Sequence, residues 1–436
     1  MTALIVGVFI LGYLLIAFES VTKISKTAVA MLMCVVCWIL YSLSFGINSE
    51  SFVGALGETS EILFFLMGAM VIVEVVDTYG GFNFVRRRLH SRSKKALLWK
   101  ITFFTFFLSA VLDNLTTAIV MIMVLRKLVD SREERLYYAS MVILAANSGG
   151  AFSPIGDVTT IMLWVKGNIS SGGVITSLFF PSVISVVIPA LLIGTRLKGD
   201  IVSIRDNEPA PDSREAMVTR KEKKLVFAIG VGGLLFVPIF KMLTHLAPFM
   251  GILLVLSLLW IVTEIVFYRK KGERHSRIGD VSELLHKIDM NTILFFLGIL
   301  TAVSALDETG VLRSFGAYLD DTFNSNPYIV TGIIGLLSAV VDNVPLVASC
   351  MGMYDLIPAS LATAEQMIYT VDGTFWELLA YCAGTGGSIL IIGSAAGVVV
   401  MGLEKITFGW YLKHVSWVAL LGYFAGIVLY MLLSLI

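Results

Sequence analysis

The sequence SAVLDNLTTAIV at residues 109–120 returns, slightly changed, as SAVVDNVPLVAS at residues 338–349. Each copy sets an aspartate beside an asparagine in surroundings made mostly of apolar residues. The two pairs are Asp113-Asn114 and Asp342-Asn343. An ionised carboxylate is costly at membrane depth, so its appearance at two related positions predicts a functional site that is built twice.

The composition indicates a polytopic helical membrane protein. Hydrophobic residues make up 57% of the 436 residues and charged residues 15%, with a mean hydropathy of +0.87; a soluble domain has about 25% charged residues. Apolar runs long enough to cross a bilayer as helices recur along the chain, so the lipid bilayer is the expected environment. The net charge is zero and the charges lie in blocks between these runs, which indicates membrane orientation and not nucleic-acid binding.

The charge blocks predict the topology and a first re-entrant hairpin. Residues 86–100 carry seven basic residues and no acidic one, which places them in the cytoplasm, whereas residues 47–60 carry only acids and are expected outside. The run 101–125 is followed by a basic stretch at 126–135. If 101–125 crossed the membrane once, that stretch would lie outside, so we expect a hairpin that turns at Asp113-Asn114 and returns to the cytoplasm.

Glycine-rich interruptions predict two broken helices. The run 136–167 contains NSGGAFSPIG at 147–156, and TGGSILIIG at 385–393 resembles it. Glycine and proline in this number do not fit inside one continuous helix. The carbonyl groups freed at 146–150 and 383–387 are expected to help coordinate a bound cation, together with the negative C-terminal ends of the helices.

These similarities predict two inverted repeats. Five spans and one hairpin in each half would invert the second half, giving about 10 transmembrane spans plus two re-entrant hairpins and two broken helices. Paired interrupted helices in inverted repeats are typical of secondary transporters. The expected units are a first repeat at 1–195 (scaffold 1–85; hairpin, broken helix and last span 101–195), a cytoplasmic linker at 196–224, and a second repeat at 225–436 (scaffold 225–306; hairpin, broken helix and last span 327–436).

The residue types at these positions favour a small cation and a proton as ligands. A buried carboxylate can hold either one but not both well, and this competition is sufficient for exchange. We therefore expect Na⁺ or Li⁺ at Asp113 and Asp342, with amide oxygens from Asn114 and Asn343. Supporting oxygen ligands are expected from Thr116, Thr117, Asn147, Ser148, Thr385 and Ser388.

Two further carboxylates have open roles. Asp157 follows the first helix break, where it could cap the next helix or bind an ion or proton; its repeat partner, Ser394, is also a capping residue. Glu74 lies within an apolar run and is a candidate for a proton path, although its repeat counterpart is Ala305.

The long motifs resemble those of the NhaD-type Na⁺/H⁺ antiporters of the ion transporter superfamily. The resemblance is carried by SAVLDNLTTAIVM, ANSGGAFSPIGDVTTIMLW, SAVVDNVPLVASCMGMYDL and GTGGSILIIGSAAGVVVMG and covers essentially the whole chain. It implies proton-coupled export of Na⁺ or Li⁺ without another cofactor, in a bacterial inner membrane. It also implies a homodimer held by the scaffold spans, with the hairpins and broken helices moving as an elevator.

Two alternatives remain. A Na⁺-coupled dicarboxylate or other anion carrier of the same superfamily would have the same fold, but an aspartate at each hairpin tip would repel a carboxylate substrate. A membrane enzyme would need a nucleophile with a base or a metal cluster, and every histidine lies in or near a predicted loop.

Overall fold

The computed structural model describes residues 2–17, 22–45, 49–81, 89, 91, 93–197, 199–200, 219–244, 246–268, 284–286, 288–340 and 343–435. The structure is 81% helical, and within these ranges the β-structure amounts to one isolated bridge between Ser93 and Asp200. Seven of the described helices are long and apolar enough to cross a membrane. The predicted all-helical membrane fold is therefore confirmed.

The first half of the chain supplies eight of the described helices. They are α1 (Thr2–Ala17), α3 (Lys26–Phe45), α4 (Ser49–Thr78), α6 (Lys94–Ser109), α7 (Asn114–Leu128), α8 (Arg132–Ala151), α9 (Val158–Lys166) and α10 (Ser171–Gly194).

The second half supplies a similar series. It comprises α12 (Arg220–Thr244), α13 (Pro248–Tyr268), α15 (Met290–Glu308), α16 (Val311–Phe323), α17 (Pro327–Ser338), α18 (Asn343–Met353), η1 (Glu365–Tyr369), α19 (Thr374–Gly386), α20 (Ala395–Glu404), α21 (Phe408–Tyr411), η2 (Leu412–Ser416) and α22 (Trp417–Leu433).

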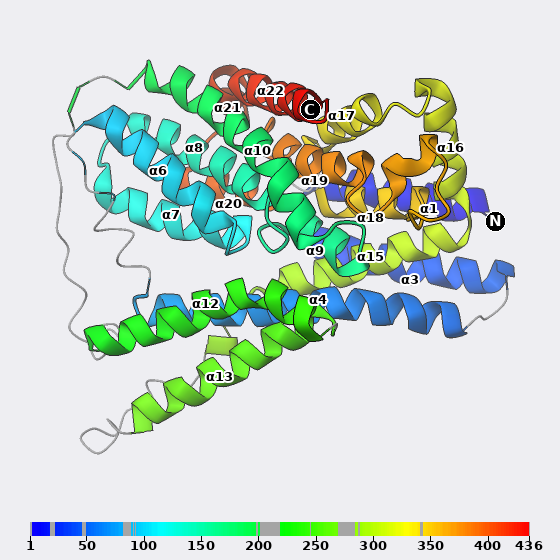
Figure 1. Ribbon diagram of the computed structural model, residues 1–436, viewed down its shortest axis with the longest axis horizontal. Helices are drawn as coiled ribbons and strands as arrows, with labels where there is room; N and C mark the ends of the chain where they lie inside the picture. The colour runs from blue at the N-terminus through cyan, green and yellow to red at the C-terminus, as the bar shows by residue number, and fades with distance from the viewer. Residues whose placement is uncertain are drawn as a thin grey trace.

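The first helices of each half pack against a helix of the other half. Helices α12 and α13 of the second half pack on α4 of the first, and α1 and α3 of the first half pack on α15 of the second. Figure 1 shows α12 and α13 beside α4, on the opposite side of the molecule from α6, α10 and α22. In that other layer α10 packs along α22, α8 packs on α6 and α7, and α19 packs on α17.

Equivalent glycines bring the broken helices against the hairpins in both halves. A Cβ atom on Gly149 of α8 would lie 2.1 Å from the carbonyl oxygen of Phe106 in α6, and one on Gly386 of α19 would lie 2.1 Å from the carbonyl oxygen of Gly335 in α17. A distance this short allows no side chain, so glycine is required for each contact. The two contacts join positions that the sequence repeat makes equivalent.

A pair of serine hydrogen bonds repeats the same relationship. The hydroxyl group of Ser109 donates to the carbonyl oxygen of Ala146 at 2.6 Å, and that of Ser338 donates to the carbonyl oxygen of Ala383 at 2.7 Å. Each bond joins the end of the first hairpin helix to the helix that packs behind it. The contacts of the first hairpin therefore recur in the second.

The helix breaks lie further along the chain than expected. Helix α8 continues to Ala151 and α19 to Gly386, so the irregular segments are 152–157 and 387–394. The glycines at 149 and 386 are close-packing residues inside the helices, which is why they do not interrupt them. Residues 146–150 and 383–386 therefore form the last turns of α8 and α19 and not the irregular segments themselves, and the last carbonyl groups of a helix have no partner within it.

Helix α4 is also longer than expected. Residues 49–60, expected as part of an external linker, form the first turns of α4. The segment contains no proline, and a glycine inside a helix costs only about 1 kcal/mol, so nothing in it ends the helix. At the other end of the helix, Glu74 lies about one turn before the last residue of α4, Thr78.

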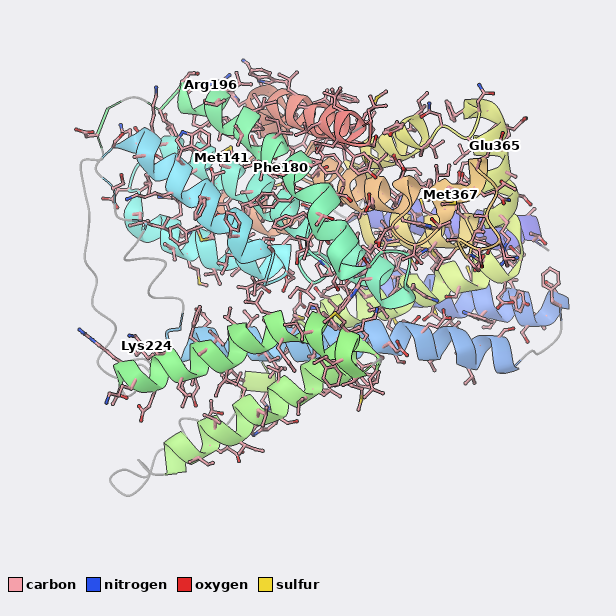
Figure 2. The ribbon with its side chains drawn as sticks, in the orientation of Figure 1. Met141, Phe180, Arg196, Lys224, Glu365 and Met367 are labelled. Carbon is pink, nitrogen blue, oxygen red and sulfur yellow. The ribbon has the colours of Figure 1, made fainter. Side chains whose placement is uncertain are left out.

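Charged residues separate toward the two ends of the molecule. One end, here called the basic end, contains the start of α6, the end of α7 and the starts of α8 and α12, with Lys94, Arg126, Arg135 and Arg220. The opposite end, the acidic end, contains the start of α4 and the ends of α9 and α15, with Glu58 and Asp307. Figure 2 shows Arg196 and Lys224 toward one end and Glu365 toward the other.

Candidate functional site

The central feature of the site is the buried carboxylate of Asp157, which is 1% exposed. Its Oδ2 atom accepts a hydrogen bond of 3.1 Å from the side-chain amide of Asn114, the first residue of α7. The same amide donates to the side-chain oxygen of Asn147 at 3.0 Å. The tip of the first hairpin and the first broken helix therefore meet at Asp157.

The second half of the chain completes this cluster. The side-chain amide of Asn343, the first residue of α18, donates to Oδ2 of Asp157 at 3.4 Å. The amide of Asn147 donates to the hydroxyl oxygens of Ser388 and Ser394, each at 2.9 Å. The cluster thus joins both hairpins and both broken helices through buried polar side chains.

Asp157 also caps α9. Its Oδ1 atom accepts from the backbone N–H of Thr159 at 3.3 Å, so the capping role is confirmed. Ser394 caps α20 in the same way, accepting from the backbone N–H of Gly397 at 3.1 Å. Because capping uses Oδ1, Oδ2 of Asp157 is directed to the two asparagine amides.

Asp113 makes a different set of contacts. Its two carboxylate oxygens accept from the backbone N–H and the hydroxyl group of Thr116, at 2.7 and 2.6 Å, and this caps α7. Asp113 also lines a cavity of about 20 Å³ together with Phe65 and Val73 of α4 and Leu234 of α12. Asp113 therefore contacts its own helix and a small apolar cavity, whereas its neighbour Asn114 contacts the central cluster. Asp342 lies outside the described residues.

The remaining predicted residues divide into two groups. Asn147 and Ser388 belong to the cluster, as described above. Ser148 accepts a hydrogen bond of 2.9 Å from Ser185 of α10, and Thr385 donates to the carbonyl oxygen of Tyr381 within its own helix at 2.6 Å. Glu74 accepts from Thr78 at 3.3 Å near the end of α4.

Two buried hydroxyl groups suit a small cation. Within the described part of the chain, the side-chain oxygens of Thr117 and Thr159 have no hydrogen-bond partner. Thr117 lies three residues after Asn114 on α7 and Thr159 two residues after Asp157, and both are completely buried. Buried polar atoms are normally paired, so such oxygens are candidate ligands. Carboxylate, amide and hydroxyl oxygens are the types of ligand atom that could hold a small cation here.

Sequence reasoning missed Thr159 as a site residue and treated Ser394 only as a cap. The signal for Thr159 was its place in GDVTT, directly after the predicted helix break. The signal for Ser394 was its equivalence to Asp157. The hydrogen bond from the amide of Asn147 to Ser394, 247 positions further along the chain, could be identified only from the fold.

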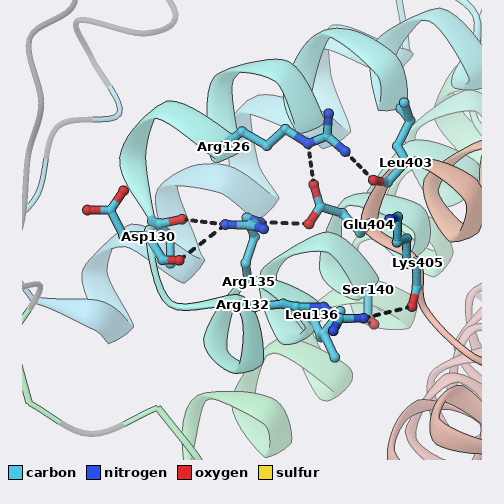
Figure 3. Close-up of polar contacts among 10 residues, drawn as sticks. Arg126, Asp130, Arg132, Arg135, Leu136, Ser140, Leu403, Glu404 and Lys405 are labelled. Atoms are coloured by element: carbon cyan, nitrogen blue, oxygen red, sulfur yellow. Dashed lines mark hydrogen bonds and ion pairs between the residues drawn. The ribbon is translucent and has the colours of Figure 1, made fainter.

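A second polar cluster lies at the basic end. The carboxylate of Glu404, at the end of α20, pairs with Nε of Arg126 at 2.7 Å and with Nε of Arg135 at 2.6 Å (Figure 3). Arg126 also donates to the carbonyl oxygen of Leu403, and Arg132 donates to that of Lys405 at 3.3 Å. Glu404 is 3% exposed. This cluster fixes α20 of the second half to α7 and α8 of the first.

The fold and the site define a polytopic membrane transporter. The citrate transporter family model (CitMHS) matches residues 13–371, which is most of the chain. The protein belongs to this family of membrane carriers.

Similar proteins were found by sequence and by structure. Sodium/proton antiporter 2 of Arabidopsis thaliana is 45% identical over 425 residues, covering 97% of each chain. The Na⁺/H⁺ antiporter NhaD of Vibrio cholerae is 29% identical over 461 residues, covering 98% of this chain and 91% of that one. The YdaH transporter of Alcanivorax borkumensis has a similar fold, with a TM-score of 0.59 and 12% identity over 93% of this chain and 97% of that chain.

Proposed function

We propose that the protein is a secondary active transporter that exchanges Na⁺ or Li⁺ for H⁺ across a membrane, with the two ions competing for buried carboxylates. The observation that carries this proposal is the position of Asp157, where both hairpins and both broken helices meet. Relatives named sodium/proton antiporters, at 45% and 29% identity over nearly the whole chain, support it.

The chemistry of exchange follows from the two ligands that the carboxylate of Asp157 would hold in turn, Na⁺ and a proton. When the carboxylate is charged, the amides of Asn114 and Asn343 donate to Oδ2 and stabilise the charge. Rotation of an asparagine side-chain amide by half a turn presents its oxygen in place of its nitrogen. A Na⁺ ion bound at Oδ2 would therefore be coordinated by amide oxygens, and a proton bound there would displace it.

Asp113 and Asp342 are proposed as further cation- or proton-binding carboxylates at the two hairpin tips. Thr116, Thr117, Ser148, Thr385 and Ser388 remain proposed supporting oxygens. Glu74 remains a proposed proton-path residue.

The proposed architecture comprises inverted repeats at 1–195 and 225–436, joined by a cytoplasmic linker at 196–224, with about 10 spans and two re-entrant hairpins. Residues 201–218 of this linker lie outside the described residues, and residues 220–224 form the first turn of α12. The equivalent contacts of Gly149 and Gly386 support it. The basic end would face the cytoplasm because positive residues are retained there. We also propose a homodimer and elevator-like movement of the hairpins and broken helices, in a bacterial inner membrane; the similar proteins include plant and bacterial members.

The alternative function is a Na⁺-coupled dicarboxylate or other anion carrier, which the name of the matching family model favours. The buried carboxylate at the centre of the site opposes it, because a carboxylate substrate would be repelled there. No catalytic function is proposed.

Reconstituted protein tests these functions directly. Liposomes with an acidic lumen and a trapped pH dye receive Na⁺, Li⁺, K⁺, succinate or citrate outside, with a protonophore as control. The proposal predicts that the lumen becomes alkaline with Na⁺ or Li⁺ alone. A response only to a dicarboxylate supplied together with Na⁺ would establish the anion carrier instead.

A further inference from the structure

A cavity of about 240 Å³ opens at the acidic end between the two halves of the chain. Its walls come from α4, α9, α15 and α18, together with the segment that follows α18. Helices α9 and α18 begin at the central cluster. Helix α4 carries α12 and α13 of the second half, and α15 carries α1 and α3 of the first half. The cavity is separate from the small apolar cavity beside Asp113.

The cavity extends toward the central site along two of its walls. Helix α9 begins directly after Asp157, and the lining residue Met162 lies five positions further on; α18 begins at Asn343, and the lining residue Ala348 also lies five positions further on. With a rise of about 1.5 Å per residue, both residues lie about 7 Å along their helices from the cluster. Two lining residues of the cavity are thus close to the site.

The charged lining of the cavity is predominantly acidic. Glu58 is paired with Lys166 across the opening, and Asp355 is paired with Arg313 at 3.4 Å. Asp307, at the end of α15, also lines the cavity. Within the described residues, its Oδ1 atom is buried and accepts no hydrogen bond. A buried carboxylate oxygen without a hydrogen-bond donor is costly, so a positive charge or a proton is its expected partner. The charges of Arg313 and Lys166 act on Asp307 from nearby, although each of these side chains is paired with another carboxylate.

A glycine provides the space in front of this carboxylate. A Cβ atom on Gly352 of α18 would lie 3.1 Å from Oδ1 of Asp307. Any larger residue at position 352 would therefore press on the carboxylate. The carboxylate comes from the helix on which α1 and α3 pack, whereas Gly352 belongs to the second hairpin, so the cavity lies at the contact between these two parts.

We propose that this cavity is the outer access route to the central site and that Asp307 binds the incoming monovalent cation before it reaches Asp157. This inference rests on the proposed antiport function. An acidic cavity with low-dielectric walls raises the local concentration of cations. Glu58, at the opening, is already neutralised by Lys166. Asp307 is then the deeper acidic group that can bind a cation.

The variant Asp307→Asn tests the role of the charge. Right-side-out and inside-out membrane vesicles present Na⁺ to the outer and inner faces, and the half-saturating Na⁺ concentration for proton exchange is measured in each. We expect an increase of about threefold or more at the outer face at low ionic strength, which shrinks when choline chloride is added because charge attraction is screened. Asp321→Asn, which removes an exposed acid from α16, is the matched control and should leave the value unchanged.

A value for Asp307→Asn equal to that of the unmodified protein at the outer face would overturn the inference, as would an effect confined to inside-out vesicles. If the unmodified protein showed no Na⁺/H⁺ exchange, the proposed function itself would fail, and the two failures are therefore distinguishable.

Cysteine labelling tests the access route even if Asp307→Asn does not fold. In a background without the four native cysteines, Ala348→Cys should react with a membrane-impermeant maleimide added to right-side-out vesicles. A protein that retains only Cys382, which is completely buried, should not react. Absence of labelling at position 348 in folded protein would exclude this cavity as an outer route.

Discussion

The side-chain amide of Asn343, in the second half of the chain, donates to the carboxylate of Asp157 in the first half, with 3.4 Å between Nδ2 and Oδ2. Asp157 lies at the start of α9 and Asn343 at the start of α18. A change at either residue therefore acts on both halves of the molecule. This relationship places the buried carboxylate of Asp157 at the contact of the two hairpin tips.

Asn147→Ala should reduce both stability and exchange. Asn147 donates to Ser388 and Ser394 and accepts from Asn114, so its loss leaves buried groups unpaired at a cost of about 1–3 kcal/mol each. Thermal unfolding in detergent and proton exchange in liposomes measure the two effects. Thr195→Ala, at the exposed end of α10, is the control. Stability and exchange equal to those of the unmodified protein would contradict the described network.

Gly149→Ala and Gly386→Ala should each destabilise the fold. The added methyl group would lie 2.1 Å from a backbone carbonyl oxygen, and overpacking of this kind costs about 1–3 kcal/mol or more. Gly402→Ala in α20 is the matched control because the space around that glycine is open. Thermal unfolding of the three variants checks the prediction, and an equal effect of all three would refute the close contacts.

Glu404→Gln should lower stability more than Glu58→Gln does. Removing one partner of a buried ion pair costs about 3–5 kcal/mol, and the partial exposure of Arg126 reduces this to about 2 kcal/mol. The Glu58–Lys166 pair is exposed, with 60% of the Glu58 side chain accessible, so its loss should cost less than about 1 kcal/mol. Denaturation midpoints compare the two variants, and the reverse order would show that the Glu404 cluster does not hold α20.

Asp113→Asn should preserve the fold and abolish exchange. Asparagine caps a helix about as well as aspartate, so α7 should keep its start at Asn114 and the melting temperature should change little. The charge that holds a cation or a proton is lost. Proton exchange and thermal unfolding are measured on the same preparation, and full exchange would limit Asp113 to capping.

The sequence was sufficient to predict the helical membrane fold and most residues of the cluster, Ser394 excepted, because hydropathy, glycine-rich interruptions and the repeated Asp-Asn pair are local signals. It did not predict which side chains of the cluster are hydrogen-bonded to one another. Asp113 and Asn114 are neighbours in the chain, yet one caps α7 beside an apolar cavity and the other meets Asp157. Their separation depends on the turn between α6 and α7, which adjacent residues do not reveal.

The glycine motifs were identified correctly but their structural role was not. Glycine interrupts a helix in isolation, whereas Gly149 and Gly386 remain helical because a neighbouring helix packs on their bare backbone. The proposed role of Asp307 was also beyond the sequence, since its position near a span end is typical of an interfacial acid. Only the packing of α15 against α18 places it beside Gly352.

Exchange by Asp157→Asn in liposomes tests the central claim most directly. Asparagine retains the oxygen that caps α9 and removes the charge for which Na⁺ and the proton compete. We expect folded protein that shows no Na⁺-dependent proton movement, while Asp321→Asn exchanges normally. Exchange by Asp157→Asn with the half-saturating Na⁺ concentration of the unmodified protein would show that Asp157 does not bind the exchanged ions.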